Sequence, residues 1–128
     1  MITLCDYLMG RDKSHAAEYS ETISIAAEEL LDRVNLLLAE LEVETLVCSG
    51  WRPPSVNAQV KGAAKHSKHM TGHAIDIADP TRKIARAIVR DPEILVRSDL
   101  YAEDPEHTRG YIHLQSVGPG SGKRIFKP

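Results

Sequence analysis

The sequence predicts an α+β fold, in which an antiparallel sheet packs against one long N-terminal helix and several short helices. Residues 20–42 carry apolar side chains at three- and four-residue steps, which is the period of an amphipathic helix. The following residues contain several short segments rich in β-branched residues or alternating apolar and polar ones. These segments do not alternate regularly with helical segments, and such an order favours an antiparallel sheet over the parallel sheet of an α/β protein.

Length and composition restrict the classes of protein that the chain can belong to. Its 128 residues suffice for one domain with a hydrophobic core, and no repeat or linker divides them, so we expect one domain spanning 1–128. The net charge of −2 does not indicate a nucleic-acid partner. No apolar run is long enough for membrane insertion, and the first residues lack the pattern of a signal peptide. We therefore expect a protein that is cytoplasmic as synthesised, and the sequence indicates no oligomeric state.

The long helix is expected to begin after Ser20, whose hydroxyl suits an N-cap. A strand is predicted at 45–50, where a β-branched run ends in glycine, and it is expected to bury Cys48 as a reduced thiol. Residues 51–68 are rich in proline, glycine and serine and predict an irregular loop. The other thiol, Cys5, forms no metal-binding pattern with Cys48.

The second half of the chain is predicted to supply most of the sheet. Strands are expected at 73–79, 100–104 and 111–117, with an edge strand at 123–128. Two helices are expected between them. One spans 79–91, with Asp79 as its cap and Pro80 in its first turn, and the other spans 91–98 and starts in the same way.

An aspartate inside an apolar run marks the candidate site. Because side chains alternate along a strand, Asp76 in SKHMTGHAIDI (67–77) lies on the face opposite its isoleucine neighbours. The same alternation in 111–117 places His113 opposite Ile112 and Leu114. If the two strands pair, Asp76 and His113 face one another, with His69 in the preceding turn.

Two imidazoles, one carboxylate and one open position form the usual ligand layout of catalytic zinc. A lone histidine on a strand is also often an ordinary hydrogen-bonded surface residue. The same ligand set suits a mononuclear iron oxygenase. Such oxygenase sites usually lie in all-β barrels, and the 20–42 helix argues against that fold.

The segment SKHMTGHAID resembles SxHxxGxAxD, the first motif of the zinc D-Ala-D-Ala metallopeptidases, which are related to lysostaphin-type peptidases and to the hedgehog signalling domain. His113 in GYIHLQ resembles the second motif, and Arg52 in SGWRPPSVN resembles the arginine of an upstream loop. The resemblance runs from about Cys48 to the end of the chain. It is most detailed for the compact peptidases encoded by phages and prophages, which share HLQ and a final GxRxF.

The resemblance implies a hedgehog/D-Ala-D-Ala-peptidase-like fold and one Zn²⁺ per chain, held by His69, Asp76 and His113. It also implies that Arg52 binds a substrate carboxylate or stabilises a developing oxyanion, since its planar guanidinium suits either task. Ser67 would help to hold the substrate, although its hydroxyl equally suits a turn.

Two further residues are candidates for contact with the substrate. Tyr111 shares a strand face with His113 and would orient the substrate or only pack. Asn57 would contact the substrate or only cap a turn.

The general base is where the sequence departs from the family pattern. Many relatives carry an acidic residue three positions before the last zinc histidine, and that position here is Gly110. We expect Glu103 to act instead, because it ends a strand predicted to run beside the His113 strand. His107 is the second candidate, since an imidazole pKa near 6.5 suits proton transfer at neutral pH.

These observations predict a zinc peptidase that cleaves peptidoglycan stem peptides, as a D-Ala-D-Ala carboxypeptidase or as an endolysin-type endopeptidase. A phage lysin of this kind would need a holin, or lysis of the cell, to reach the wall. The alternative is a non-catalytic zinc-binding module, or a phage structural component with the same fold.

Overall fold

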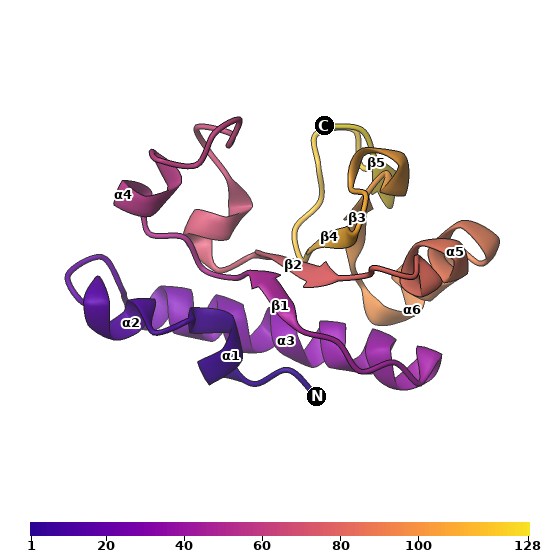
Figure 1. Cartoon of the computed structure of the whole chain (residues 1–128), viewed down its shortest axis with the longest axis horizontal. Coiled ribbons are helices and arrows are strands. Elements are labelled where there is room, and N and C mark those ends of the chain that lie inside the picture. The colour runs from indigo at the N-terminus through magenta and orange to yellow at the C-terminus, as the bar shows by residue number, and fades with distance from the viewer.

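The computed structural model describes all of residues 1–128 and builds a five-stranded sheet beside one long helix (Figure 1). The sheet has the order β1-β2-β4-β3-β5. Its strands are β1 (Val47–Ser49), β2 (Ala74–Ala78), β3 (Tyr101–Glu103), β4 (Tyr111–Gln115) and β5 (Ile125–Phe126). The mixture of helices with a mainly antiparallel sheet confirms the α+β class.

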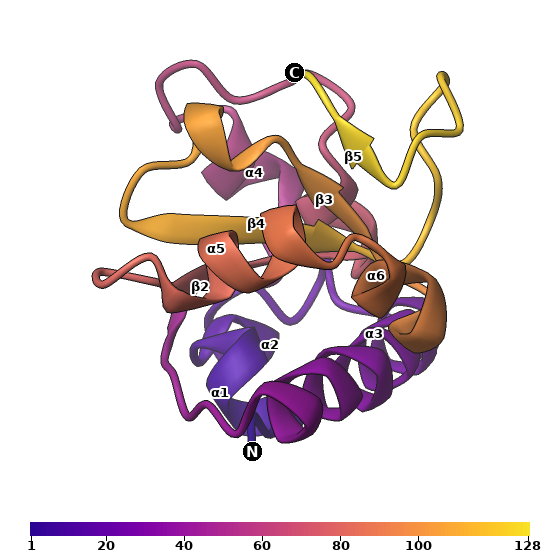
Figure 2. The same ribbon diagram turned by 90° about the vertical axis from the view of Figure 1, so that its right-hand side faces the viewer.

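Six α-helices and two 3₁₀ turns accompany the sheet. The helices are α1 (Leu4–Leu8), α2 (Arg11–Ser14), α3 (Glu21–Leu41), α4 (Pro54–Asn57), α5 (Lys83–Arg90) and α6 (Glu93–Ser98). The turns are η1 (Lys68–Thr71) and η2 (Pro105–His107). Figure 2 shows α3 on one side of the central strands, with α4 and its following loop on the other side.

The long helix α3 confirms the prediction for residues 20–42. The Ser20 hydroxyl accepts a hydrogen bond from the Ile23 amide and caps the first turn. The apolar stripe of α3 is buried against β2 and β4 in a cluster of 21 residues that forms the core. The side chains that β2 and β4 contribute to it, Ile75, Ile77, Ile112 and Leu114, are fully buried. Alternation along the two strands therefore leaves their other face free for polar residues.

Three expectations about the sheet and helices were wrong. The sheet is not wholly antiparallel, because β3 and β5 pair in parallel. After β4 the chain reverses direction and continues past β3. β5 therefore pairs with the outer edge of β3 and runs parallel to it. The long helix is not the first element either, since α1 and α2 precede it, and residues 54–57 of the expected loop form α4.

The helix expected from residue 79 begins later, so Asp79 is not its N-cap residue and Pro80 does not lie in its first turn, although the Asp79 side chain still binds that turn. The Asp79 carboxylate accepts hydrogen bonds from the amides of Ile84 and Ala85, at 3.0 and 2.8 Å. The helix begins only at Lys83, because Arg82 takes a left-handed conformation and closes a turn onto the Asp79 carbonyl. The Asp79 side chain therefore binds the start of α5 from the other end of the turn formed by residues 79–82.

Cys48 is exposed, not buried. It lies on the edge strand β1, where its neighbour Val47 packs against the core. Alternation then directs the Cys48 side chain to the opposite face of the sheet. Cys5 is exposed as well, and the two thiols are free.

Candidate metal centre

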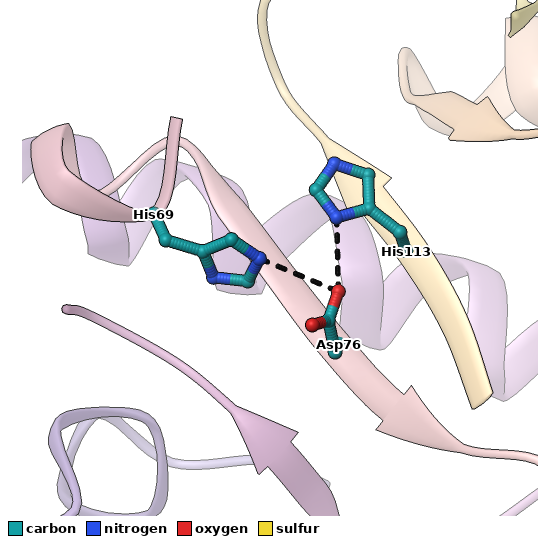
Figure 3. A group of neighbouring side chains, drawn as sticks. All are labelled: His69, Asp76 and His113. Carbon is teal, nitrogen blue, oxygen red and sulfur yellow. Dashed lines mark hydrogen bonds and ion pairs between the residues drawn. The ribbon is translucent and has the colours of Figure 1, made fainter. Parts of the chain in front are cut away.

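Three candidate ligands converge on the face of the sheet that is turned away from α3 (Figure 3). Asp76 on β2 and His113 on β4 are direct partners in the antiparallel register. His69 reaches them from the η1 turn, which precedes β2. One nitrogen or oxygen from each side chain lies within 4.8 Å of those of the other two. The strand alternation and the turn predicted from the sequence bring these residues together.

Gly72 ends η1 with a φ of +82°. A β-carbon at this position would lie 2.8 Å from the carbonyl oxygen of Ile23 on α3. Both the conformation and the close approach require glycine. This glycine therefore lets the turn that carries His69 pack directly against the long helix.

His69 presents an unpaired nitrogen to the centre of the cluster. Its side chain is only 1% exposed, and Nδ1 lies 2.9 Å from the carbonyl oxygen of Gly50. A carbonyl oxygen can only accept, so Nδ1 carries the hydrogen and Nε2 keeps its lone pair. Nε2 lies 3.4 Å from Asp76 Oδ1, within ion-pair range, but has no hydrogen-bond partner. A buried polar atom without a partner is costly, and a bound metal ion would remove that cost.

His113 has partners on both ring nitrogens. Nδ1 lies 2.9 Å from Asp76 Oδ1, and Nε2 lies 2.9 Å from Gln115 Oε1. Burial alone would lower the pKa of His113, but the hydrogen bond to Asp76 and the charge of that carboxylate raise it above its ordinary value.

Burial would raise the pKa of Asp76, but the hydrogen bond of its carboxylate to His113 and the nearby imidazole of His69 lower it well below the usual range. Asp76 is therefore ionised. A negative charge beside two imidazoles attracts either a proton or a metal cation.

The donor set fits zinc. Two imidazole nitrogens and one carboxylate oxygen are the ligand types that zinc takes in hydrolytic enzymes, where a fourth position stays open. The hydrogen bond from His69 to a backbone carbonyl is the kind of outer contact that metal-binding histidines normally make. Figure 3 shows both rings directed toward the same carboxylate oxygen.

A groove of about 520 Å³ opens over the three ligands. Its walls include four of the residues predicted to act on substrate, namely Arg52, Ser67, Glu103 and Tyr111. Phe126 closes one side, with its ring edge-on to His113 at a centroid distance of 6.1 Å. The groove therefore brings together the candidate ligands, a candidate base and a candidate substrate-binding cation.

Arg52 and Ser67 contribute to the groove in different ways. The Nε atom of Arg52 is buried without a partner, so this cation is held near the ligands with unused hydrogen-bonding capacity. The hydroxyl of Ser67 accepts a hydrogen bond from the His69 amide at 3.2 Å, which makes it the N-cap of η1. Ser67 thus positions the turn that carries a ligand and also faces the groove.

Glu103 is the acidic groove residue outside the ligand set. It ends β3, which pairs with β4 as predicted. Burial raises the pKa of its carboxyl above the ordinary value, and the charge of Asp76 acts in the same direction, although His113 opposes them. A carboxyl with a raised pKa is suited to accept and return a proton. Burial also raises the pKa of the nearby Tyr111 hydroxyl.

Two candidate residues lie apart from this constellation. His107 is exposed on η2 and does not line the groove. Asn57 is buried at the end of α4, where its amide donates to the Ala64 carbonyl at 3.0 Å. It braces the loop that forms one wall of the groove without facing the cavity.

Several supporting contacts were not identified from the sequence. The carbonyl of Gly50 is a backbone atom, so no side chain signalled its role. A β-carbon on Gly50 would lie 1.8 Å from the Tyr7 carbonyl oxygen, so α1 packs directly on this glycine. The Tyr7 hydroxyl also donates to the Ala74 carbonyl at 2.9 Å, beneath the site. Gln115 could have been predicted from the sequence, because alternation along the strand places it on the same face as His113.

Comparison with known proteins places the chain in a family. The family model described as Peptidase M15 matches residues 9–114. The chain belongs to the Peptidase M15 family. The match starts well before the resemblance seen from Cys48 onward, so it also covers most of the N-terminal half of the chain. A search of curated proteins and a search of solved structures found no match.

Membership of the M15 family implies a metallopeptidase. M15 peptidases depend on zinc, and the His69, Asp76 and His113 cluster of this M15 chain can hold a metal ion. None of its helices is long and apolar enough to cross a membrane.

Proposed function

We propose that this M15 peptidase cleaves an amide bond in peptidoglycan stem peptides with one zinc ion per chain. The observation that carries the proposal is the unpaired, buried Nε2 of His69, which faces Asp76 and His113 at the floor of an open groove. Most buried polar side-chain atoms have a hydrogen-bond partner, so a free buried nitrogen that faces a carboxylate and a second imidazole supports a metal ligand.

The roles of the other groove residues follow from their chemistry. When bound, zinc would lower the pKa of a water molecule toward neutrality and polarise the scissile carbonyl. Glu103 takes the proton of the attacking water and returns it to the leaving amine, because its raised pKa suits both transfers. Arg52 stabilises the negative charge that develops on the carbonyl oxygen, or binds a carboxylate of the substrate. Ser67 and Tyr111 line the groove where they can orient the peptide.

Cleavage at a terminal D-Ala would make the protein a carboxypeptidase, and cleavage within the stem or cross-bridge would make it an endolysin-type endopeptidase. The second activity fits a phage lysin that reaches the wall through a holin or after lysis of the cell. Incubation with purified peptidoglycan distinguishes the two activities. Mass spectrometry of the products would show release of free D-Ala in the first case and of cut muropeptides in the second.

The same experiment tests the proposal itself. New amine ends that appear with the wild type, and that vanish after chelation and in Glu103→Gln, are the expected result. If Glu103→Gln cleaves normally and His107→Ala does not, the base assignment is wrong. If the wild type binds zinc but cleaves no wall substrate, the chain is a zinc-binding module. This module is the second candidate function, because Gly110 stands where many relatives carry an acidic residue.

A further inference from the structure

The two histidine rings of the metal centre are held by hydrogen bonds at different ring nitrogens. His69 directs Nδ1 to the Gly50 carbonyl, whereas His113 directs Nε2 to the side-chain oxygen of Gln115. Each ring therefore turns its other nitrogen toward Asp76. The acceptor for His69 is backbone, but the acceptor for His113 is a side chain that substitution can remove.

The orientation of the Gln115 amide is fixed by a second contact. Its Nε2 group donates to the Val117 carbonyl at 2.9 Å, and the side chain is buried, with an exposure of 5% for the residue. A flipped amide would set its oxygen against the Val117 carbonyl oxygen and turn its NH₂ group toward His113. The flipped amide would lose its hydrogen bond to Val117, so Gln115 offers His113 an acceptor and not a donor.

An acceptor at this position decides which nitrogen of a neutral His113 holds the proton. A neutral imidazole has one N–H, and Asp76 and Gln115 lie on opposite nitrogens of the ring. When the proton stays on Nε2 to satisfy the buried Gln115 oxygen, the lone pair of Nδ1 is free on the side of Asp76. Without that acceptor, the proton can move to Nδ1, where Asp76 accepts it and the metal-binding lone pair is lost.

We propose that Gln115 is a positioning residue that selects the Nε2–H form of His113 and so presents Nδ1 to the metal. The inference rests on the zinc centre of the proposed function but concerns metal affinity, which is measured without substrate. Outer hydrogen bonds of this kind typically change metal affinity by about 10- to 100-fold.

The test compares three variants by competition with a chromophoric zinc chelator. Gln115→Met keeps the length of the side chain without the acceptor and is expected to weaken zinc binding by about 10- to 100-fold. Gln115→Glu keeps an acceptor and is expected to bind zinc more tightly than Gln115→Met. Asn35→Leu is the matched control, because Asn35 lies on α3 away from the groove and its side-chain amide also bonds to backbone, at Ile2. It is expected to leave zinc affinity unchanged.

A second readout separates positioning from general loss of structure. The ¹⁵N chemical shifts of the His113 ring in the zinc-bound wild type should show hydrogen on Nε2 alone, and thermal unfolding of the metal-free variants shows whether each is folded. A folded Gln115→Met protein that binds zinc as tightly as the wild type overturns the role of Gln115 and leaves the proposed function standing. A folded wild type that binds no zinc overturns both.

Discussion

The two faces of the β2–β4 pair make opposite uses of the same ten residues. Ile75, Ile77, Ile112 and Leu114 point toward α3 and are fully buried in the core. Asp76 and His113, which alternate with them, point to the groove and contact one another there. The two-residue period of the strand thus separates stability from chemistry. Changes on the core face should affect folding, and changes on the groove face should affect metal binding and turnover.

The largest expected effect lies on the groove face. Glu103→Gln is expected to lower kcat by about 10²- to 10⁴-fold, the range over which a positioned general base contributes. Zinc stoichiometry should not change. Burial raises the pKa of Glu103, so its charge is unfavourable in the folded protein, and the neutral amide should slightly raise the free energy of unfolding at pH 7. Steady-state kinetics and urea unfolding check the two effects, and a large loss of stability would show that Glu103 is structural.

The core face should show the reverse pattern. Ile112→Ala is expected to lower the free energy of unfolding by about 2–5 kcal/mol, because it leaves a cavity between β4 and α3. The protein that remains folded should still bind one zinc per chain.

The matched control for this change is Ile25→Ala, since Ile25 is 59% exposed on the same long helix. It is expected to change the stability by no more than about 0.5 kcal/mol. If the two substitutions cost the same, the assignment of the core face is wrong.

Two glycines test the turn that carries His69. Gly72→Ala is expected to cost about 2–4 kcal/mol, because the left-handed conformation alone costs about 1–2 kcal/mol and the new methyl group would also meet the Ile23 carbonyl. Displacement of η1 should weaken zinc binding as well.

Gly110 also has a positive φ, of 86°, but a β-carbon there would meet nothing within 4 Å. Gly110→Ala should therefore cost only about 1–2 kcal/mol and leave zinc affinity unchanged. Equal losses of zinc affinity in the two variants would contradict the role of the η1 turn.

The smallest expected effect is a displacement of the pH profile. Glu103 must be ionised to accept a proton, and its pKa is raised above 4.5 by burial. Activity should therefore fall as the pH drops through the pKa of this carboxyl. Initial rates measured from pH 4 to 8, with the zinc content of each sample, separate this limb from loss of metal. A rate that does not fall on acidification, with zinc retained, would exclude Glu103 as the base.

The features that local pattern controls could be predicted from the sequence. The α3 stripe follows a helical period, and the pairing of Asp76 with His113 follows from alternation along two strands. The short helix α1 has too few residues to show a period, and it is held by contacts with distant residues, such as the bond from the Trp51 amide to the Tyr7 carbonyl. The parallel pairing of β5 likewise depends on where a loop returns the chain.

Prediction of the site was limited in the same way. The three candidate ligands have side chains whose chemistry is legible in the sequence, and the structure brings them together. The hydrogen-bond acceptors that support them were harder to recognise. Every residue has a backbone carbonyl like that of Gly50, and Gln115 gains its role only through the orientation of its amide. Only the folded arrangement of the chain reveals these two acceptors.

The most direct test of the account is a zinc titration of the metal-free protein in the presence of peptidoglycan, with amine release as the signal. The account predicts activity that rises linearly with added zinc and stops rising at one equivalent per chain. In the Asp76→Asn variant, the same titration should give no activity at stoichiometric zinc. Amine release that needs no zinc, or that is unchanged in Asp76→Asn, would contradict the assignment of the groove face as a zinc-dependent hydrolytic centre.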